Sequence, residues 1–380
     1  MAEGKPLPSL SIYIHLPWCE RQCPYCDFNS HESATIPEKQ YVQALLDDLD
    51  TDRHLAEGRT VETLFIGGGT PSLFSAGAIE ELLAGLAARL NFSADFEATM
   101  EANPGSAEAG KFRGFRSAGI NRLSLGVQSF QDEKLRALGR VHNSEQARSA
   151  IDSAYDAGFD NINIDLMHGL PDQSEADALL DLETALSYHP LHLSWYQLTI
   201  EPNTVFHKRP PQLPVEDTLA DIQDKGEALL ADYGFSQYEV SAYSKAGGQC
   251  RHNLNYWSFG DYLALGAGAH GKISHRDGRI TRYAKTRAPT DYLRGLRRTA
   301  TQRTLDSQEI VEEFMLFALR LNEGFSLQHF QRVTGLSPNS TAEQIASLVA
   351  KGLLLQEGDR VQASPLGRRF LDSVIAEFMH

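Results

Sequence analysis

Short apolar runs alternate with amphipathic stretches over the first 200 residues of the chain. The runs have the length of buried strands, while stretches such as Glu38–Leu49 and Ile79–Leu90 repeat apolar residues at i, i+3, i+4 and i+7, as helices do. The expected strands are Leu10–Leu16, Thr63–Gly67, Glu97–Ala102, Arg122–Val127, Asn161–Met167 and Leu193–Thr199. This alternation predicts an α/β fold with a parallel sheet, and its six units predict a partial (β/α)6 TIM-like barrel rather than a full barrel of eight.

The pattern changes after the sixth unit. A Pro-rich hinge, Lys208–Pro214, is followed by an expected helix over Asp217–Tyr233 and by a basic loop around Arg279–Arg298. Helical periodicity then returns, and Gly352–Ala363 reads as a hairpin, which is typical of a small winged-helix-like domain. The expected regions are a barrel core over 1–214, a barrel-completing and connecting region over 215–304, and a C-terminal domain over 305–380.

Composition and charge narrow the classes of partner. A hydrophobic content of 42% allows a sizeable core, and a formal net charge of -15 argues against a surface that binds nucleic acid or anionic membranes. No run of 18 apolar residues appears, and Met1–Leu10 lacks the basic-then-apolar order of a signal peptide. We therefore expect a cytoplasmic protein with no nucleic-acid partner.

Three of the four cysteines lie within eight positions, directly after the first expected strand. Zinc sites commonly use two separated cysteine pairs, and no second pair is present. Three thiolates at the CxxxCxxC spacing of Cys19, Cys23 and Cys26 suit a [4Fe–4S] cluster that keeps one iron open for a chelating cosubstrate such as S-adenosylmethionine. The alternative is a set of buried or merely redox-active thiols.

The residues around these cysteines extend the motif. The chain reads Tyr13-Ile-His-Leu-Pro-Trp-Cys19 before it and Tyr25-Cys26-Asp27-Phe28 at its end. This stretch resembles the radical S-adenosylmethionine superfamily, in the branch that contains the oxygen-independent coproporphyrinogen III oxidases and the heme chaperones. The resemblance runs from Tyr13 to the C-terminal domain. It implies the cluster, S-adenosylmethionine, and a reductant such as flavodoxin or ferredoxin.

Further polar motifs stand where the expected strands end. Gly67-Gly68-Gly69 lets the backbone approach a ligand closely, and Gln128, Arg140 and Asp165 offer an amide, a guanidinium and a carboxylate to a zwitterionic, ribose-bearing molecule. Without the resemblance, Arg140 and Asp165 could instead form a buried ion pair, and Glu101 could cap a helix. The residues that the resemblance implies for S-adenosylmethionine are Tyr13, Tyr25, Gly68, Gly69, Thr70, Glu101, Gln128, Arg140, Asp165, Thr199 and His270. In the oxidase, Gln128, Arg140 and Asp165 correspond to positions around a second S-adenosylmethionine, so one or two molecules are expected.

Two departures separate the chain from the oxidases in this branch. The oxidases carry another cysteine two positions after the third, where this chain has Phe28, and the first expected strand begins too early for their N-terminal extension. The stretch Cys250-Arg-His252-Asn-Leu-Asn-Tyr256-Trp257 instead matches the HNxxYW motif of the heme chaperones. The resemblance implies that His252 ligates heme iron, with Cys250 as an alternative, and that Tyr256 and Trp257 stack on the macrocycle. A histidine beside aromatic residues can equally be a structural residue.

The sequence therefore predicts a heme-binding chaperone that carries a cluster and S-adenosylmethionine. The resemblance implies heme as cargo and acceptor haemoproteins as partners, with respiratory cytochromes as candidates. It also allows a homodimer and transient contact with the membrane during delivery. The alternative is an oxygen-independent coproporphyrinogen III oxidase, and Phe28 leaves open whether the chain is an enzyme at all.

Overall fold

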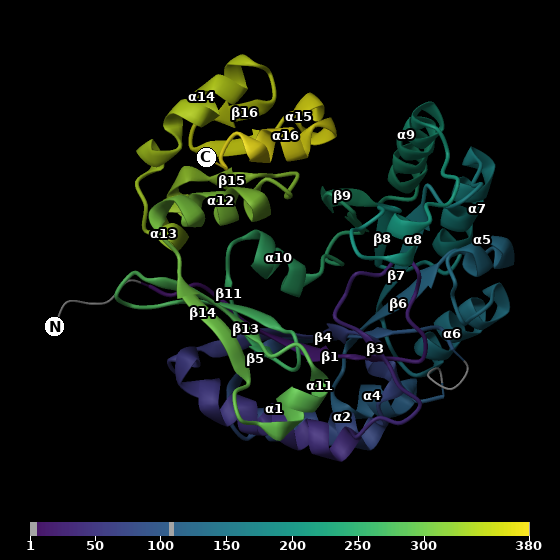
Figure 1. Cartoon of the computed structure of the whole chain (residues 1–380). Coiled ribbons are helices and arrows are strands. Elements are labelled where there is room, and N and C mark those ends of the chain that lie inside the picture. Colours follow the sequence, from purple (N-terminus) through teal and green to yellow (C-terminus); the bar gives the residue numbers. More distant parts are fainter. Residues whose placement is uncertain (1–5, 106–109, 380) are drawn as a thin grey trace.

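Six strands lie side by side in the order in which they occur in the chain, each parallel to the next. The computed structural model describes residues 6–105 and 110–379. The six strands are β1 (Leu10–Leu16), β4 (Thr60–Gly68), β5 (Asn91–Ala102), β6 (Arg122–Gln128), β7 (Asn161–His168) and β8 (His192–Gln197). Helices cover the outer face of the curved sheet (Figure 1). The predicted partial barrel is confirmed.

The covering helices carry one apolar face each, which packs on the sheet. In α1, for example, Tyr41, Leu45 and Leu49 are fully buried, at the spacing of one helix face. The helices of the barrel are α1 (Glu38–Asp52), α2 (Ala76–Ala87), α4 (Phe112–Ala118), α5 (Asp132–Ala137), α6 (Ser144–Asp156), α7 (Glu175–Leu186), α8 (Val205–Lys208) and α9 (Glu216–Asp232). The helix predicted over Asp217–Tyr233 is therefore present, shifted by one residue.

The sheet continues beyond the six strands on both edges. β11 (Asp261–Leu265) pairs in parallel with β1, and β12 (His270–Ser274), β13 (Ile280–Lys285) and β14 (Thr299–Thr304) follow as antiparallel neighbours. At the other edge β10 (Ala242–Ser244) pairs with β8, and β9 (Ser236–Glu239) pairs with β10. The result is a twelve-stranded sheet.

The basic loop predicted around Arg279–Arg298 was wrong, because this stretch holds β13 and α11 (Pro289–Arg294). Two of its charges, those of Arg282 and Lys285, are paired inside the fold, while Arg279, Arg287, Arg294 and Arg297 are exposed. Lys285 Nζ lies 2.7 Å from both Asp48 and Asp52 of α1, and Arg282 pairs with Glu313 at 2.7 Å. Ile280 and Tyr283 are buried beside them.

A compact unit of short helices and a small sheet ends the chain. The strands β15 (Phe325–Ser326), β17 (Arg360–Ala363) and β16 (Leu354–Glu357) pair in that order, so the hairpin predicted over Gly352–Ala363 is present. Its helices are α12 (Ser307–Ala318), α13 (Leu327–Thr334), α14 (Ala342–Ala350), α15 (Pro365–Arg369) and α16 (Leu371–Ala376). This unit has its own apolar core, which Phe259 and Ile280 of the preceding region join.

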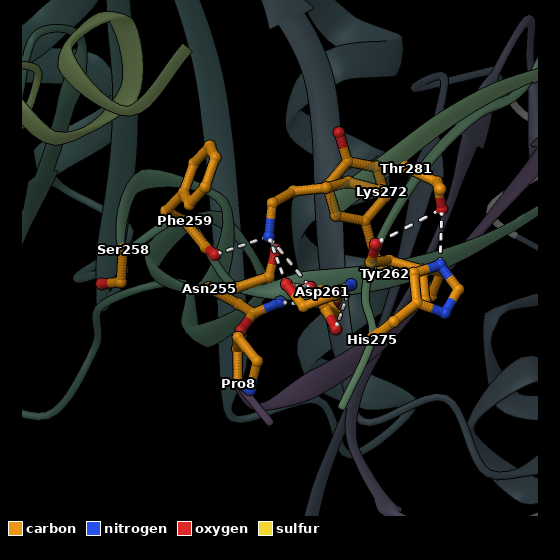
Figure 2. A network of polar contacts seen from close by, with 12 residues as sticks. Pro8, Asn255, Ser258, Phe259, Asp261, Tyr262, Lys272, His275 and Thr281 are labelled. Atoms are coloured by element: carbon orange, nitrogen blue, oxygen red, sulfur yellow. Dashed lines mark hydrogen bonds and ion pairs between the residues drawn. The ribbon is translucent and has the colours of Figure 1, made fainter. Parts of the chain in front are cut away.

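The helix α10 (Arg251–Trp257) lies between the sheet and this C-terminal unit (Figure 1). It contacts β1, β4 and α12. The turn after it is held by Asp261, whose carboxylate pairs with Lys272 at 2.9 Å and with Arg59 at 2.7 Å. Figure 2 shows the Lys272 ammonium between this carboxylate and the Phe259 carbonyl, to which it donates at 2.9 Å. The network fixes where α10 ends and β11 begins.

Within the described part of the chain, no helix combines the length and the apolar character needed to cross a membrane.

Candidate functional site

The three clustered cysteines lie in the loop that follows β1. The loop contains a short strand, β2 (Trp18–Cys19), which pairs with β3 (His31–Glu32). It also contains a turn in which the Cys26 amide donates a hydrogen bond to the Cys23 carbonyl at 3.1 Å. Cys19, Cys23 and Cys26 are half-buried free thiols, and all three line one cavity of about 610 Å³. The fold thus brings them together as the motif predicted.

The cavity opens at the carboxyl ends of the parallel strands, where α/β barrels carry their sites. Its lining includes residues from every strand between β4 and β8. These are Gly68 and Gly69 of the β4 end, Glu101 of β5, Gly126 and Gln128 of β6, Asp165 and Met167 of β7, and Ser194 and Tyr196 of β8. Strand-end motifs that are far apart in sequence therefore face a single volume.

The glycine loop packs directly on the cysteine strand. Gly69 and Thr70 donate to the backbone carbonyls of Leu16 and Trp18 at 2.8 and 2.7 Å, and a Cβ at Gly69 would lie 2.5 Å from the Trp18 oxygen. Thr70 Oγ1 lies 3.6 Å from Cys19 Sγ. Only glycine permits this approach, which places the loop next to the first thiol.

Arg140 reaches across the cavity from the segment after α5. Its guanidinium lies 3.6 Å from Cys23 Sγ and donates to Asn103 Oδ1 at 2.7 Å and to the Gly126 carbonyl at 2.8 Å. Asp165 accepts instead from Asn163 and Ser124, at 2.7 and 3.2 Å. The alternative of an Arg140–Asp165 ion pair is therefore not what the fold forms, and both side chains face the cavity.

Gln128 and Glu101 complete the predicted polar set. Gln128 has a left-handed backbone (φ 69°), a strained conformation for a non-glycine residue, and its Oε1 accepts from the Tyr196 hydroxyl at 3.0 Å. Glu101 accepts from the Gly68 amide at 3.2 Å. Burial and the nearby Asp165 carboxylate raise the pKa of Glu101 to about 7, although the Gly68 amide opposes this rise.

The remaining predicted cosubstrate residues divide into two groups. Tyr25 and Thr199 line the cavity, and Thr199 donates to Glu201 at 2.8 Å. Tyr13 and His270 do not line it: the Tyr13 hydroxyl contacts His15 Nδ1 at 3.0 Å, and His270 is exposed at the start of β12. The structure thus brings nine of the eleven predicted residues to one cavity, leaving out Tyr13 and His270.

The predicted heme ligands point into the protein interior. His252 is 0% exposed, and its two ring nitrogens contact Thr63 Oγ1 and the Tyr256 hydroxyl, both at 2.8 Å. Burial, followed by the Arg122 charge, lowers the pKa of His252 to about 3. Cys250 is also buried, with Sγ 3.8 Å from Glu97 Oε1. In this conformation neither side chain is open to an iron.

The motif helix begins on an internal carboxylate. Glu97 of β5 accepts from the amides of Arg251 and His252, at 3.3 and 3.1 Å, as expected for a carboxylate at a helix N-terminus. Of the motif residues, Asn253 lines the large cavity and Trp257 lines a second, smaller cleft. Tyr256 lines neither.

Sequence reasoning missed the polar floor of the large cavity. Arg122 is 2% exposed, and among the described residues its Nε has no hydrogen-bond partner. The other floor residues are Ser124, Asn163, His192, Ser194 and Asn253. The sequence signal for this floor is a polar residue at an inward position of a strand that is otherwise apolar, and these positions lie before the strand-end motifs.

The donor set fits an iron–sulfur cluster. Three thiols share the cavity mouth and no fourth thiol lines it, which matches a cubane with one iron left for another ligand. Among the described residues, 6–105 and 110–379, no three His, Cys, Asp or Glu side chains lie close enough together to hold a single metal ion. This is expected, because thiolates on different irons of a cubane stand further apart than the ligands of one ion.

Comparison with known proteins agrees with this geometry. The model of the radical SAM superfamily matches residues 13–185, and that of the HemN C-terminal domain matches residues 305–370. The chain is 50% identical to the heme chaperone HemW of Escherichia coli over 98% of this chain and 99% of that protein. It is 47% identical to the heme chaperone HemW of Haemophilus influenzae over 98% of each.

A solved structure shows the same fold. The coproporphyrinogen III oxidase HemN of Escherichia coli, described as a radical SAM enzyme, superposes with a TM-score of 0.83 over 99% of this chain and 91% of that one, at 23% identity. The shared fold does not distinguish the chaperones from the oxidase, but the sequence identity over the whole length does, since it is 50% to the HemW chaperone and 23% to HemN. The chain therefore belongs to the radical SAM superfamily and, within it, to the family of the heme chaperone HemW.

Proposed function

We propose that the chain binds heme and transfers it to acceptor haemoproteins, and that it carries a [4Fe–4S] cluster on Cys19, Cys23 and Cys26 with S-adenosylmethionine beside it. The observation that carries the proposal is the 50% identity, over essentially the whole length, to a relative named as a heme chaperone. The shared cavity of the three thiols supports the cluster.

When bound, such a cluster supplies an electron that can cleave the sulfonium of S-adenosylmethionine. The residues of the chain have positioning roles. The Gly68–Gly69 backbone lines the cavity and can contact the methionine end, and the Glu101 carboxylate can accept from its ammonium group or from ribose hydroxyls. The Arg140 guanidinium, 3.6 Å from Cys23 Sγ, offsets the negative charge of a thiolate-bound cluster.

The protonation of Glu101 predicts how binding of S-adenosylmethionine depends on pH. Because its pKa is about 7, the carboxylate is partly protonated at neutral pH and must lose a proton to accept from the ligand. We expect the affinity to fall as the pH drops below about 7, by up to about tenfold per pH unit. Glu101→Gln should bind more weakly and lose this dependence. Equilibrium binding titrations between about pH 6 and pH 8 test the prediction, which a flat wild-type profile would contradict.

The alternative of coproporphyrinogen oxidation rests on the fold shared with HemN, which at 23% identity does not carry function. Phe28 is 63% exposed at the cavity mouth and provides no sulfur where the oxidase pattern has a further cysteine. We therefore propose that the chain does not decarboxylate coproporphyrinogen.

One experiment separates the two functions. Anaerobically reconstituted, reduced protein is titrated with heme and, in parallel, incubated with coproporphyrinogen III and S-adenosylmethionine. We expect a shifted Soret band that saturates near one heme per chain, and no protoporphyrinogen. Formation of protoporphyrinogen would favour the oxidase, and a wild-type protein without a Soret shift would refute the chaperone.

The partners follow from the same proposal. Acceptor haemoproteins, with respiratory cytochromes as candidates, would receive the heme, and a flavodoxin or ferredoxin would reduce the cluster. We further propose a cytoplasmic protein that meets the membrane only during delivery and that can form a homodimer. Sedimentation of the reconstituted protein with and without heme tests the last point.

A further inference from the structure

A second cleft lies where the motif helix meets the C-terminal unit. While Asn253 of α10 lines the large cavity, Leu254, Trp257 and the adjoining Ser258 line this cleft, which has a volume of about 360 Å³. Its other wall comes from the C-terminal unit. The lining residues there are Ala318, Leu321, Glu323, Gly324, Phe325, Ser326, His329 and Arg360, and Tyr238 and Gln249 close one end.

Apolar and polar side chains share the walls of this cleft about equally. Leu254 and Trp257 face Leu321 and Phe325, so two aromatic rings and two aliphatic side chains border the space. The indole Nε1 of Trp257 is buried and has no hydrogen-bond partner among the described residues. Such a surface suits a flat, apolar molecule with a polar edge.

One imidazole lines the cleft, and its hydrogen bonds define which ring nitrogen carries the lone pair. His329 Nε2 lies 2.9 Å from the Ser258 carbonyl, an acceptor, so Nε2 must hold the proton. Nδ1 then carries the lone pair, and it accepts from Arg332 at 2.7 Å. A carbonyl that orients one nitrogen while the other remains basic is the arrangement of metal-binding histidines.

An iron that ligates a histidine must displace a hydrogen-bond partner of its ring, and the free-energy cost of this differs between His329 and His252. Arg332 is solvent-exposed, so an iron can replace its hydrogen bond to Nδ1 at little cost. The His252 ring points inward, so turning it toward an iron would break its buried hydrogen bond to Thr63 and its partly buried one to Tyr256, and would leave polar atoms unpaired in the core. With one ring nitrogen donating and the other accepting, His329 has the hydrogen bonds of a neutral imidazole, the form that ligates iron.

The turn that orients His329 is itself held by hydrogen bonds. The Ser258 carbonyl accepts a hydrogen bond from His329, and the next carbonyl along the chain, that of Phe259, accepts one from the buried Lys272 ammonium at 2.9 Å (Figure 2). Phe259 has a left-handed backbone (φ 57°), a conformation that these two donors help to hold. The imidazole is thus aligned by the end of the HNxxYW helix.

The charge of one lining residue suits a flat ligand that carries carboxylates on its edge. Arg360 lines the cleft and is half exposed; its guanidinium donates to the Glu323 backbone carbonyl at 2.5 Å and lies 3.8 Å from the exposed Glu323 carboxylate, which also lines the cleft. The N–H groups that these contacts leave over can pair with a propionate carboxylate. The cleft can hold only part of a macrocycle, so one edge would remain outside the protein. A partly exposed cargo is what a protein that releases it requires.

We propose that heme binds in this cleft between α10 and the C-terminal unit, with Nδ1 of His329 as its iron ligand and Arg360 at a propionate. The proposal rests on the proposed function, since it names the site of the same cargo. In it the HNxxYW motif contributes the Trp257 wall and orients His329, while His252 stabilises the helix from inside.

The test uses full-length, cluster-reconstituted protein titrated with ferric heme and followed by the Soret band and electron paramagnetic resonance. We expect His329→Ala and His329→Gln to lose the imidazole-ligand signature and to bind heme about tenfold more weakly. Added free imidazole should restore both the signature and the affinity in His329→Ala, at concentrations that leave the spectrum of the wild type unchanged. His54→Ala, which removes a surface histidine outside the cleft, is the matched control and should behave as wild type.

A second arm addresses the propionate. Arg360→Gln should weaken binding of heme but not of heme dimethyl ester, which carries no carboxylates. His252→Gln should keep the ligand signature in any preparation whose circular dichroism is native.

The outcomes are distinguishable. A wild-type protein that binds no heme refutes the proposed function and the cleft with it. Wild-type binding that both His329 variants leave unchanged, or a signature lost in natively folded His252→Gln alone, overturns the cleft while the proposed function stands.

Discussion

Serine at Cys19, Cys23 or Cys26 is expected to reduce the iron content of reconstituted protein from about four atoms per chain to nearly none. Each thiol would hold a different iron, and an alcohol is a far poorer ligand for iron than a thiolate. The sulfur-to-iron charge-transfer absorption should disappear with the iron. Iron and sulfide analysis, together with the visible spectrum of anaerobically reconstituted protein, measures the effect.

The same chain provides a matched control for this substitution. Cys250 is a fourth free thiol, but it is buried beside Glu97 and does not line the cavity. Cys250→Ser should therefore retain a full complement of iron. The cluster assignment would be refuted if Cys250→Ser lost iron as Cys19→Ser does, or if all three motif variants kept it.

Replacing Asp261 by alanine is expected to lower the free energy of unfolding by about 3–5 kcal/mol. The carboxylate holds Lys272, which is 1% exposed, together with Arg59 and the Ser274 amide and hydroxyl. Its removal leaves the Lys272 ammonium buried without a counter-charge, at the turn that ends α10. Denaturant-induced unfolding, followed by circular dichroism, measures the change.

A surface ion pair tests whether burial is the cause of the stability loss expected for Asp261→Ala. Asp277 pairs with Arg279 at 2.7 Å, with both side chains more than half exposed. Asp277→Ala should leave the free energy of unfolding almost unchanged. Equal losses for Asp261→Ala and Asp277→Ala would contradict the account.

The pH dependence of the same group has a definite sign. Burial alone would raise the pKa of Asp261, but Lys272 and Arg59 outweigh it and hold the pKa below its usual range. Its stabilisation is therefore complete above the pKa of the unfolded chain, about 4, and is lost as the pH falls through the lower folded value. The stability difference between wild type and Asp261→Ala should be constant near pH 7 and shrink in acid.

Local patterns were sufficient wherever the signal lay within one element or one loop. The strand Leu10–Leu16 was predicted to the residue, because a run of apolar residues between polar flanks is a property of the strand itself. The cysteine spacing predicted a shared site for the same reason, since the three thiols lie in a single loop. Position at a strand end likewise identified Glu101, Gln128 and Asp165 as neighbours in space.

Pairings between distant segments could not be predicted in this way. β11 lies in parallel with β1 although Leu10 and Asp261, which pair in the register, are separated by most of the chain. The basic residues around β13 suggested a basic loop, and only the pairing of Lys285 with Asp48 and Asp52, and of Arg282 with Glu313, shows why a strand forms there. No local window contains both partners of such a contact.

The sequence by itself determined the family motif, the barrel and which loop bears the thiols, because these depend on spacing and periodicity along the chain. Only the tertiary structure decided which way each side chain of the HNxxYW motif faces. His252 turns inward to Thr63, while Trp257 turns to the cleft that His329 shares. These orientations follow from what packs on each face of α10, which residues far away in the chain provide.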